Sequence, residues 1–220
     1  MTREELAALV QGSELWRSAR CGSLGASRLA DAVVRTKTGW GASRANLMAE
    51  LIAERLTGTP TETFVNAAMQ RGTETEPEAR TAYEFRQNCD VIQIGIAPHP
   101  SIKGTHASPD GLVGSDGLLE IKAPQTATHL DTLLGGSIAD KYIKQAQWQM
   151  VCCERAWVDW VSYDPRLPEA MRLFVKRIPR DDILIRSLEK DVTEFLDELN
   201  EKLARLHNLY EKPVNILAAG

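Results

Sequence analysis

The stretch that decides the fold is Ser108-Pro109-Asp110-Gly111-Leu112-Val113-Gly114-Ser115-Asp116-Gly117-Leu118-Leu119-Glu120-Ile121-Lys122. Its four residues 114–117 are typical of a hairpin turn, because glycine tolerates positive φ angles and aspartate can hydrogen-bond to its own backbone. Short apolar runs precede and follow this turn. The stretch therefore predicts two paired strands, around which the rest of the chain folds.

The predicted hairpin places three ionisable side chains on one wall. Side chains alternate between the two faces of a strand, so Glu120 and Lys122 point the same way while Ile121 points into apolar packing. Pairing of the two arms can bring Asp110 beside Glu120. We therefore expect two carboxylates and one ammonium at one place, with the main-chain carbonyl of Ile121 within reach.

This grouping has the chemistry of a metal site. Two carboxylates at one spot repel each other unless a cation lies between them, and oxygen ligands without a matching His or Cys favour Mg²⁺ or Mn²⁺. Such ions stabilise the attacking and leaving oxygens of a phosphodiester, while Lys122 would orient or deprotonate the attacking water. The spacing is loose, however, and a surface hairpin with solvated Glu120 and Lys122 side chains is the alternative.

Motifs along most of the chain resemble one known family. Pro109-Asp110 followed by Glu120-Ile121-Lys122 resembles the signature of the PD-(D/E)xK nuclease superfamily, and within it the chain is similar to the phage lambda-type exonucleases, also called YqaJ-like viral recombinases. The resemblance implies an α/β fold with a central mixed β-sheet flanked by helices, the restriction-endonuclease-like core. The other motifs that carry it are Trp16-Arg17-x-x-Arg20, Gly25-Ala26-Ser27, Arg71-Gly72-x-x-x-Glu76, Ser108-Pro109-Asp110-Gly111, Leu119-Glu120-Ile121-Lys122-Ala123-Pro124, Gln145-x-Gln147 and Tyr163-Asp164-Pro165-Arg166.

Length and composition fit one such domain. With 220 residues, 43% of them hydrophobic and 25% charged, the chain suits a single nuclease domain over residues 1–220 that ends in a long helix. No apolar run approaches the roughly 18 residues of a membrane span, and the acidic start differs from a secretory signal. The four cysteines show no paired metal spacing, so we expect reduced thiols in the cytoplasm.

The net charge of −4 is unevenly distributed. Residues 14–46 hold six basic and two acidic residues, whereas residues 181–201 hold eight acidic and two basic ones. The local field, and not the total charge, decides where a polyanion docks. The asymmetry suits a DNA-processing enzyme with a basic channel and an acidic exterior, and it equally suits an ordinary solvated surface.

Periodicity predicts the elements around the hairpin. We expect helices over about 43–57, 66–88, 126–135 and 140–153, an interruption at Pro77, and Ser27 as the N-cap of a further helix. Strands are expected over about 91–96, 156–163 and 171–178. From Leu188 to Tyr210, apolar residues keep three- and four-residue steps, which predicts a long helix packed against its own domain or against a neighbouring subunit.

The resemblance implies roles for residues outside the hairpin. Arg20, Ser27 and Ser108 would grip a 5′-terminal phosphate, since a guanidinium offers phosphate a bidentate fork and a serine at a helix start adds a donor. From the residues alone, Arg20 would be a surface ion-pair residue and Ser27 only a cap. The resemblance also implies that Glu76 faces the metal site through water and that Gln145 positions the scissile phosphate or the water.

Structural roles for several of these residues remain as alternatives to the functional ones. Glu76 precedes a proline, where a helix N-terminus alone would favour an acid, and Gln145 can belong to a solvated polar face that includes Gln149. Met69 matches an apolar side chain that wedges between DNA strands, but methionine is equally a core filler. We expect His106 to be a structural or surface residue, because no second histidine is spaced to join it in a metal site.

The resemblance implies a function. By this resemblance the chain would be a Mg²⁺-dependent 5′-to-3′ exonuclease that degrades one strand of linear double-stranded DNA from a 5′-phosphorylated end. The products would be 5′-mononucleotides and 3′ single-stranded overhangs for homologous recombination by strand annealing. Asp110 would bridge two Mg²⁺ ions, for which Mn²⁺ can substitute, and Glu120 and the Ile121 carbonyl would complete one site.

The implied partners are double-stranded DNA ends, two further copies of the chain in a ring-shaped homotrimer that makes digestion processive, and a phage-type single-strand annealing protein, with no membrane. Two other functions stay open. One is an endonuclease with the same metal chemistry, and the other is a non-catalytic DNA-end binder.

Overall fold

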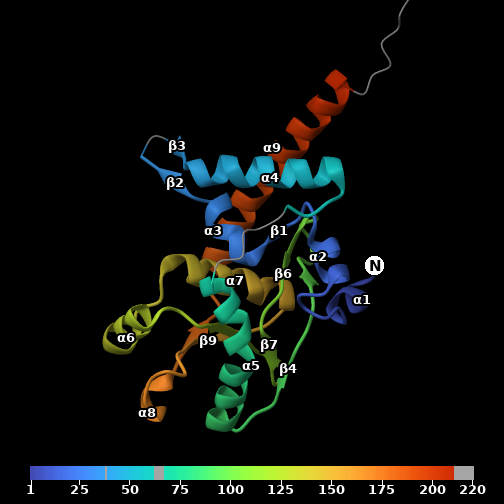
Figure 1. Ribbon diagram of the computed structural model, residues 1–220. Helices are drawn as coiled ribbons and strands as arrows, with labels where there is room; N and C mark the ends of the chain where they lie inside the picture. Colours follow the sequence, from blue (N-terminus) through green and yellow to red (C-terminus); the bar gives the residue numbers. More distant parts are fainter. Residues whose placement is uncertain (38, 62–66, 211–220) are drawn as a thin grey trace, which may run out of the picture.

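A five-stranded mixed sheet lies at the centre of the computed structural model, which describes residues 1–37, 39–61 and 67–210 (Figure 1). Its strand order is β10-β9-β8-β7-β4, in which β8 and β9 run parallel and the other neighbours antiparallel. The predicted α/β architecture is therefore confirmed. The strands are β1 (Leu24–Gly25), β2 (Arg35–Thr36), β3 (Gly39–Trp40), β4 (Val91–Ile92), β5 (Ala97–Pro98), β6 (Thr105–Ala107), β7 (Gly111–Val113), β8 (Gly117–Lys122), β9 (Trp157–Tyr163) and β10 (Leu173–Pro179).

The predicted hairpin is the pair β7 and β8. Gly111 lies opposite Leu119 in the antiparallel register. Gly114, in the turn, has a φ of +55°, the left-handed region that favours glycine. A Cβ on Gly117 would lie 2.1 Å from the ring of Trp157, so only glycine lets β8 approach the start of β9 this closely.

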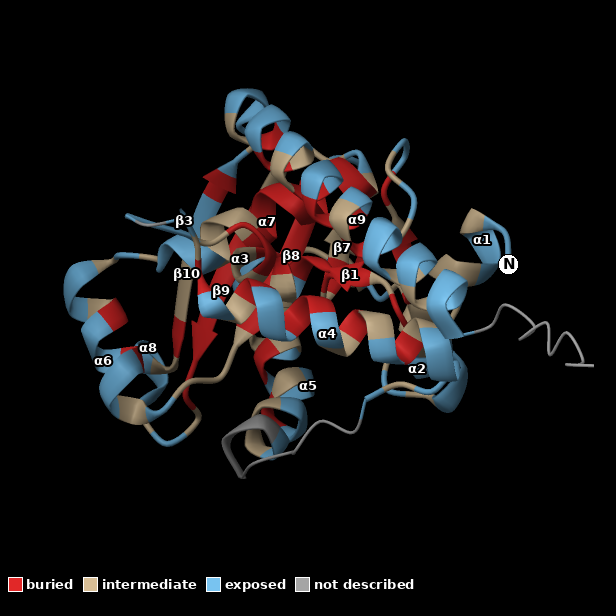
Figure 2. Cartoon of the chain, turned by 90° about the horizontal axis from the view of Figure 1, so that it is seen from above, coloured by how far each residue is buried: buried red, intermediate tan, exposed pale blue. Residues whose placement is uncertain are grey.

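Helices cover both faces of this sheet, and its central strands β8 and β9 are largely buried between them (Figure 2). On one face Leu119 and Ile121 of β8 pack with Tyr83 of α5, and on the other face Leu118 packs with Met150 of α7. The helical segments are α1 (Arg3–Ala7), α2 (Glu14–Arg20), the 3₁₀ turn η1 (Ala26–Arg28), α3 (Leu29–Ala32), α4 (Ala42–Thr57), α5 (Ala67–Gln87), α6 (Thr126–Gly135), α7 (Asp140–Cys153), α8 (Glu169–Arg172) and α9 (Asp182–Tyr210).

A second apolar cluster joins a small sheet to the helices α3, α4, α7 and α9. The small sheet has the order β1-β6-β5, and β1 runs parallel to β6. In Figure 1, α4 lies across the long α9. Val192, Phe195 and Leu199 of α9 are buried in this cluster, which confirms that the predicted apolar seam packs against its own chain there. Towards the end of α9, Leu209 and Tyr210 are exposed.

Three local predictions are wrong. Pro77 does not interrupt α5, because burial of Ala79 and Tyr83 against the sheet outweighs the hydrogen bond that proline removes. The strand predicted over 91–96 pairs only at Val91 and Ile92. Ser27 is not an N-cap, since it lies inside the 3₁₀ turn and that turn begins without a side-chain cap.

The basic N-terminal segment and the acidic α9 face each other. Arg35 contacts Asp191 at 2.9 Å, and Arg44, which is buried, contacts Glu198. Part of the basic charge that the sequence assigns to a DNA channel is therefore neutralised within the chain. None of the described helices combines the length and apolarity that a bilayer crossing requires.

Candidate active site

Asp110 lies just before β7 and is held against β8. Its backbone N–H donates to the carbonyl of Leu119 at 3.1 Å, and its Oδ2 accepts from the N–H of Ile121 at 2.5 Å. In a strand, the N–H and C=O of one residue point to the same edge. The Ile121 carbonyl therefore faces the edge of β8 that carries the Asp110 carboxylate, as the proposed metal ligation requires.

The Glu120 side chain is only 5% exposed, and hydrogen-bond donors from three side chains surround its carboxylate. Lys122 Nζ and Gln145 Nε2 donate to its Oε1, the latter at 2.6 Å. Gln149 Nε2 donates to its Oε2 at 2.5 Å. The solvated hairpin and the solvated glutamine face are both wrong, because Glu120, Gln145 and Gln149 are buried.

Gln149 is a site residue that the sequence reasoning missed. It follows Gln145 by four positions on α7, which places both side chains on one helix face above Glu120. The four-residue spacing of Gln145 and Gln149 is the sequence signal that could have identified Gln149 as a site residue. The Oε1 atom of Gln149 is buried and has no hydrogen-bond partner among the described residues.

Glu76 reaches the same cluster from α5. It lies in the middle of that helix, so the explanation by a helix N-terminus is wrong. Burial raises the pKa of Glu76, and the Glu120 carboxylate raises it further, against the opposing effect of Arg80. Arg80, one turn further along α5, donates to Glu76 and was also missed.

The carboxylates at the site repel one another and attract the ammonium group of Lys122. Burial raises the pKa of Asp110 well above its usual range, and Glu120 and Glu76 raise it further. Burial alone would lower the pKa of Lys122, but Glu120 and Asp110 outweigh it and raise that pKa. Lys122 is therefore an ammonium group, which suits it to orienting water or neutralising charge. It could act as a base only if added positive charge nearby lowered its pKa.

The donor chemistry fits a hard divalent cation. Asp110, Glu120, Glu76 and the Ile121 carbonyl offer only oxygen atoms, and the Glu120 carboxylate raises the pKa of both Asp110 and Glu76. Within the described part of the chain, no three His, Cys, Asp or Glu side chains surround a common point as metal ligands. Both carboxylate oxygens of Glu120 accept hydrogen bonds, from Lys122 and from the two glutamines.

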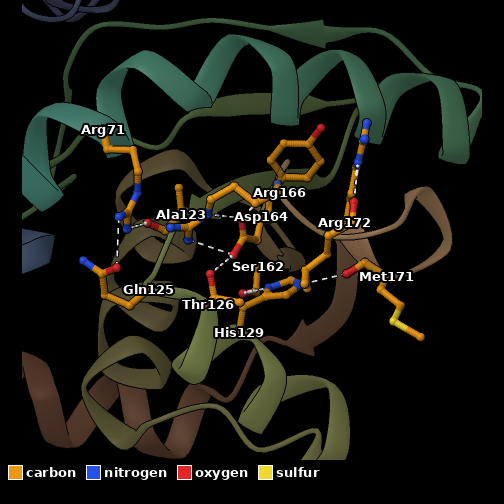
Figure 3. A network of polar contacts seen from close by, with 12 residues as sticks. Arg71, Ala123, Gln125, Thr126, His129, Ser162, Asp164, Arg166, Met171 and Arg172 are labelled. Atoms are coloured by element: carbon orange, nitrogen blue, oxygen red, sulfur yellow. Dashed lines mark hydrogen bonds and ion pairs between the residues drawn. The ribbon is translucent and has the colours of Figure 1, made fainter.

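The segment that follows Lys122 is tied to α5 (Figure 3). Arg71 of α5 donates to the Ala123 carbonyl at 3.2 Å and to the Gln125 side chain at 3.1 Å. Both acceptors follow β8 directly, so Arg71 couples the helix that carries Glu76 to the end of the strand that carries Lys122.

A second set of contacts in Figure 3 fixes the start of α6. Thr126 donates to Asp164 Oδ2 at 2.8 Å, and Arg166 binds both oxygens of Asp164 at 2.7 and 2.8 Å. Hydrogen bonds from Arg166 lower the pKa of Asp164. Nearby, His129 is buried between Ser162 Oγ at 2.7 Å and the Met171 carbonyl at 2.9 Å. These contacts hold the β8–α6 connection in place.

The three residues predicted to bind phosphate lie near the small sheet. Arg20 and Ser27 line one cavity of about 340 Å³. Ser108 does not line it, but its Oγ is buried and has no partner among the described residues. Gly25 and His106 lie opposite each other in the parallel pair β1 and β6, and Ser27 and Ser108 each follow by two residues. The sheet therefore carries both serines to the same end.

His106 and Met69 were left with open roles. His106 is buried and bonded on both ring nitrogens, so it is not a surface residue. Met69 belongs to α5, and its side chain lies outside the described residues.

Comparisons with known proteins identify relatives of this chain. Residues 15–156 match the YqaJ-like viral recombinase domain. Two crystal structures of LHK-Exo, an alkaline exonuclease from Laribacter hongkongensis, are similar to this chain. They share 50% identity with it over 89% of this chain and 97% of theirs, and the TM-scores are 0.84 for the complex with dAMP and 0.83 for the other.

A phage-related exonuclease from Haemophilus somnus 129PT shares the fold at 14% identity, with a TM-score of 0.66 over 86% of this chain and 99% of its own. The search of curated proteins returned no match. The family match and the 50% identity together show that this chain belongs to the YqaJ-like viral recombinase family.

Proposed function

We propose that the chain is a Mg²⁺-dependent exonuclease that degrades one strand of linear double-stranded DNA in the 5′-to-3′ direction. The observation that carries the proposal is the grouping of Asp110, Glu120, Lys122 and Glu76 at the end of β8. Membership in the viral recombinase family and 50% identity to an alkaline exonuclease support nuclease activity on DNA in recombination. The dAMP bound by that relative supports mononucleotides as products.

Asp110 would bridge two Mg²⁺ or Mn²⁺ ions, while Glu120 and the Ile121 carbonyl complete one site. When bound, the ions supply positive charge at the attacking and leaving oxygens of the phosphodiester. Lys122, held as an ammonium, orients the water or neutralises the developing charge. Glu76 adds acceptor oxygens through water, and Gln145 positions the scissile phosphate.

The polarity would come from Arg20, Ser27 and Ser108. A guanidinium and two hydroxyls capture the 5′-terminal phosphate, and this fixes the next phosphodiester bond relative to the metal ligands. The unpartnered, buried hydroxyl of Ser108 supports a ligand there, because a buried donor without a partner costs free energy.

The larger assembly is also part of the proposal. A single nuclease domain over residues 1–220 would form a homotrimeric ring around DNA, which makes digestion processive, and would leave 3′ overhangs for a single-strand annealing partner. Closed rings form from head-to-tail contacts between identical chains. The free cysteines fit a reducing compartment, which supports the cytoplasm as its location.

A time course on end-labelled linear duplex, with Mg²⁺, with Mn²⁺ and with chelator, tests this function. We expect metal-dependent release of mononucleotides, no cleavage of a covalently closed circle, and no activity in Asp110→Asn or Glu120→Gln. Cleavage of the circle would instead identify an endonuclease. Activity that survives both substitutions and chelation would remove the metal mechanism altogether.

A further inference from the structure

Arg20 is fixed on several sides before any ligand binds. Its guanidinium carbon lies 4.0 Å from the centre of the Trp16 ring, and Trp16 is itself anchored by a hydrogen bond to the Gly95 carbonyl at 3.3 Å. The Nε of Arg20 donates to His106 Nε2 at 3.0 Å. Among the described residues, no ion pair engages Arg20, and burial lowers its pKa.

The hydrogen bond to Arg20 decides where the proton of His106 lies. A guanidinium has only donors, so His106 Nε2 must carry the lone pair. The ring proton of the neutral imidazole is then on Nδ1, which lies 2.9 Å from Ser23 Oγ. Ser23 Oγ therefore accepts a hydrogen bond from the Nδ1–H group, and this favours the tautomer whose Nε2 can accept from Arg20.

Burial keeps His106 neutral. Burial, together with the nearby charge of Arg20, lowers the pKa of His106 to about 3. A protonated imidazole would present a donor to Arg20 and repel it. The neutral form is thus the one that holds the guanidinium in place.

Gly25 shows how tightly this arrangement is packed. A Cβ on Gly25 would lie 3.3 Å from His106 Nε2 and 3.4 Å from Arg20 Nη2. Gly25 and His106 are register partners in the small sheet, so the position of the imidazole is set by the strands and not by a loop. With Nε engaged by His106, the two Nη groups are the donors left for a ligand in the cavity that Arg20 lines.

We propose that Ser23 and His106 form a positioning pair that holds Arg20 with its Nη groups directed at a 5′-terminal phosphate. Ser23 also lines the cavity, but the role assigned to both residues is to position Arg20 and not to bind the phosphate themselves. They set the preference of the enzyme for 5′-phosphorylated over 5′-hydroxyl ends. This inference rests on the proposed exonuclease function and adds residues to its phosphate pocket.

The test compares initial rates on duplexes with 5′-phosphate and 5′-hydroxyl ends, and binding of the same ends in chelator by fluorescence anisotropy. We expect His106→Leu to reduce the phosphate preference about tenfold in both measurements, because it removes an acceptor from a charged donor. Ser23→Ala should reduce it about threefold. His106→Gln, which offers an acceptor oxygen near the former Nε2, should restore most of it.

Ser101→Ala is a matched control. It breaks another serine–histidine contact, at 3.5 Å to His99 Nδ1, away from this cavity, and should leave the preference unchanged. Arg20→Ala should abolish the preference. If Arg20→Ala does so while folded His106→Leu and Ser23→Ala do not reduce it, the positioning pair is wrong and the phosphate pocket stands.

If wild type has no preference for phosphorylated ends, the phosphate pocket and this inference both fail. If His106→Leu does not fold, as judged by its thermal transition, Ser23→Ala and His106→Gln decide the question. Full preference in Ser23→Ala, or none in folded His106→Gln, would then overturn the inference.

Discussion

Asp110→Asn should stabilise the metal-free protein although it removes a proposed metal ligand. Asp110 is held beside two other carboxylates, Glu120 and Glu76, which disfavour its ionised form. Two unit charges about 4 Å apart interact by about 4 kcal/mol at an effective dielectric constant of 20. Lys122 attracts the same carboxylate and offsets part of this repulsion.

We therefore expect Asp110→Asn to raise the free energy of unfolding by about 1–2 kcal/mol, or Tm by about 2–8 °C for a chain of this length. Asparagine retains a side-chain oxygen that can accept the hydrogen bond from the Ile121 N–H.

The effect has a definite pH dependence. The folded-state pKa of Asp110 is raised, so the folded protein binds more protons than the unfolded chain between the ordinary and the raised pKa. Wild type consequently loses stability as pH rises through that window. The advantage of Asp110→Asn should grow as pH rises through that window and should disappear below the ordinary pKa of an aspartate.

Thermal unfolding followed by circular dichroism at pH 8 measures the effect, in chelator and during titration with Mg²⁺ or Mn²⁺. At a free metal concentration of 100 times Kd, wild type should gain about 2.7 kcal/mol, or about 5–11 °C. Asp110→Asn should gain much less. Asp131→Asn, on the exposed part of α6, is the matched control and should stay within about 0.5 kcal/mol of wild type.

Two results would refute the reasoning. A lower Tm for Asp110→Asn than for wild type in chelator would show that the carboxylates do not repel one another at this site. Equal stabilisation of both proteins by metal would place the metal elsewhere.

Three further predictions concern contacts outside the carboxylate cluster. Asp164→Ala should lower the free energy of unfolding by about 2 kcal/mol, because it removes charged hydrogen bonds to Arg166 and Thr126, and an unchanged urea midpoint would contradict this. Burial lowers the pKa of His106 to about 3, so its contribution to stability is full above its ordinary pKa and lost as pH falls toward 3. Wild type should therefore lose up to about 1.4 kcal/mol per pH unit relative to His106→Gln between pH 6 and 4, and a pH-independent difference in urea unfolding would oppose it. Burial raises the pKa of Cys153 to about 12, so at pH 8 a thiol reagent should label it only after unfolding, and peptide mapping of label in the native protein would show otherwise.

Much of the local structure follows from the sequence because short-range chemistry decides it. The glycine-rich turn at 114–117 specifies the β7–β8 hairpin, and alternation along β8 places Glu120 and Lys122 on one face. The apolar steps from Leu188 onward give the long α9. The order and residue types of the motifs also identify the family, because both can be read from the sequence without knowing where the fold places each motif.

The assembly of the site depends on contacts between distant segments, which periodicity does not encode. Glu76 lies close enough to Glu120 for the two charges to interact, because α5 packs against the sheet through Ala79 and Tyr83. This packing keeps α5 continuous and outweighs the local preference of Pro77. Gln149 becomes a donor to Glu120 because α7 lies over β8.

The surroundings of Arg20 likewise depend on the tertiary structure. Its partner His106 is brought beside it by the pairing of β1 with β6, two strands far apart in the sequence. The sequence determined which chemical groups were available and which short elements form. Only the tertiary structure decided which groups share one buried space, because burial and charge proximity arise from packing between elements and set the ionisation of each group there.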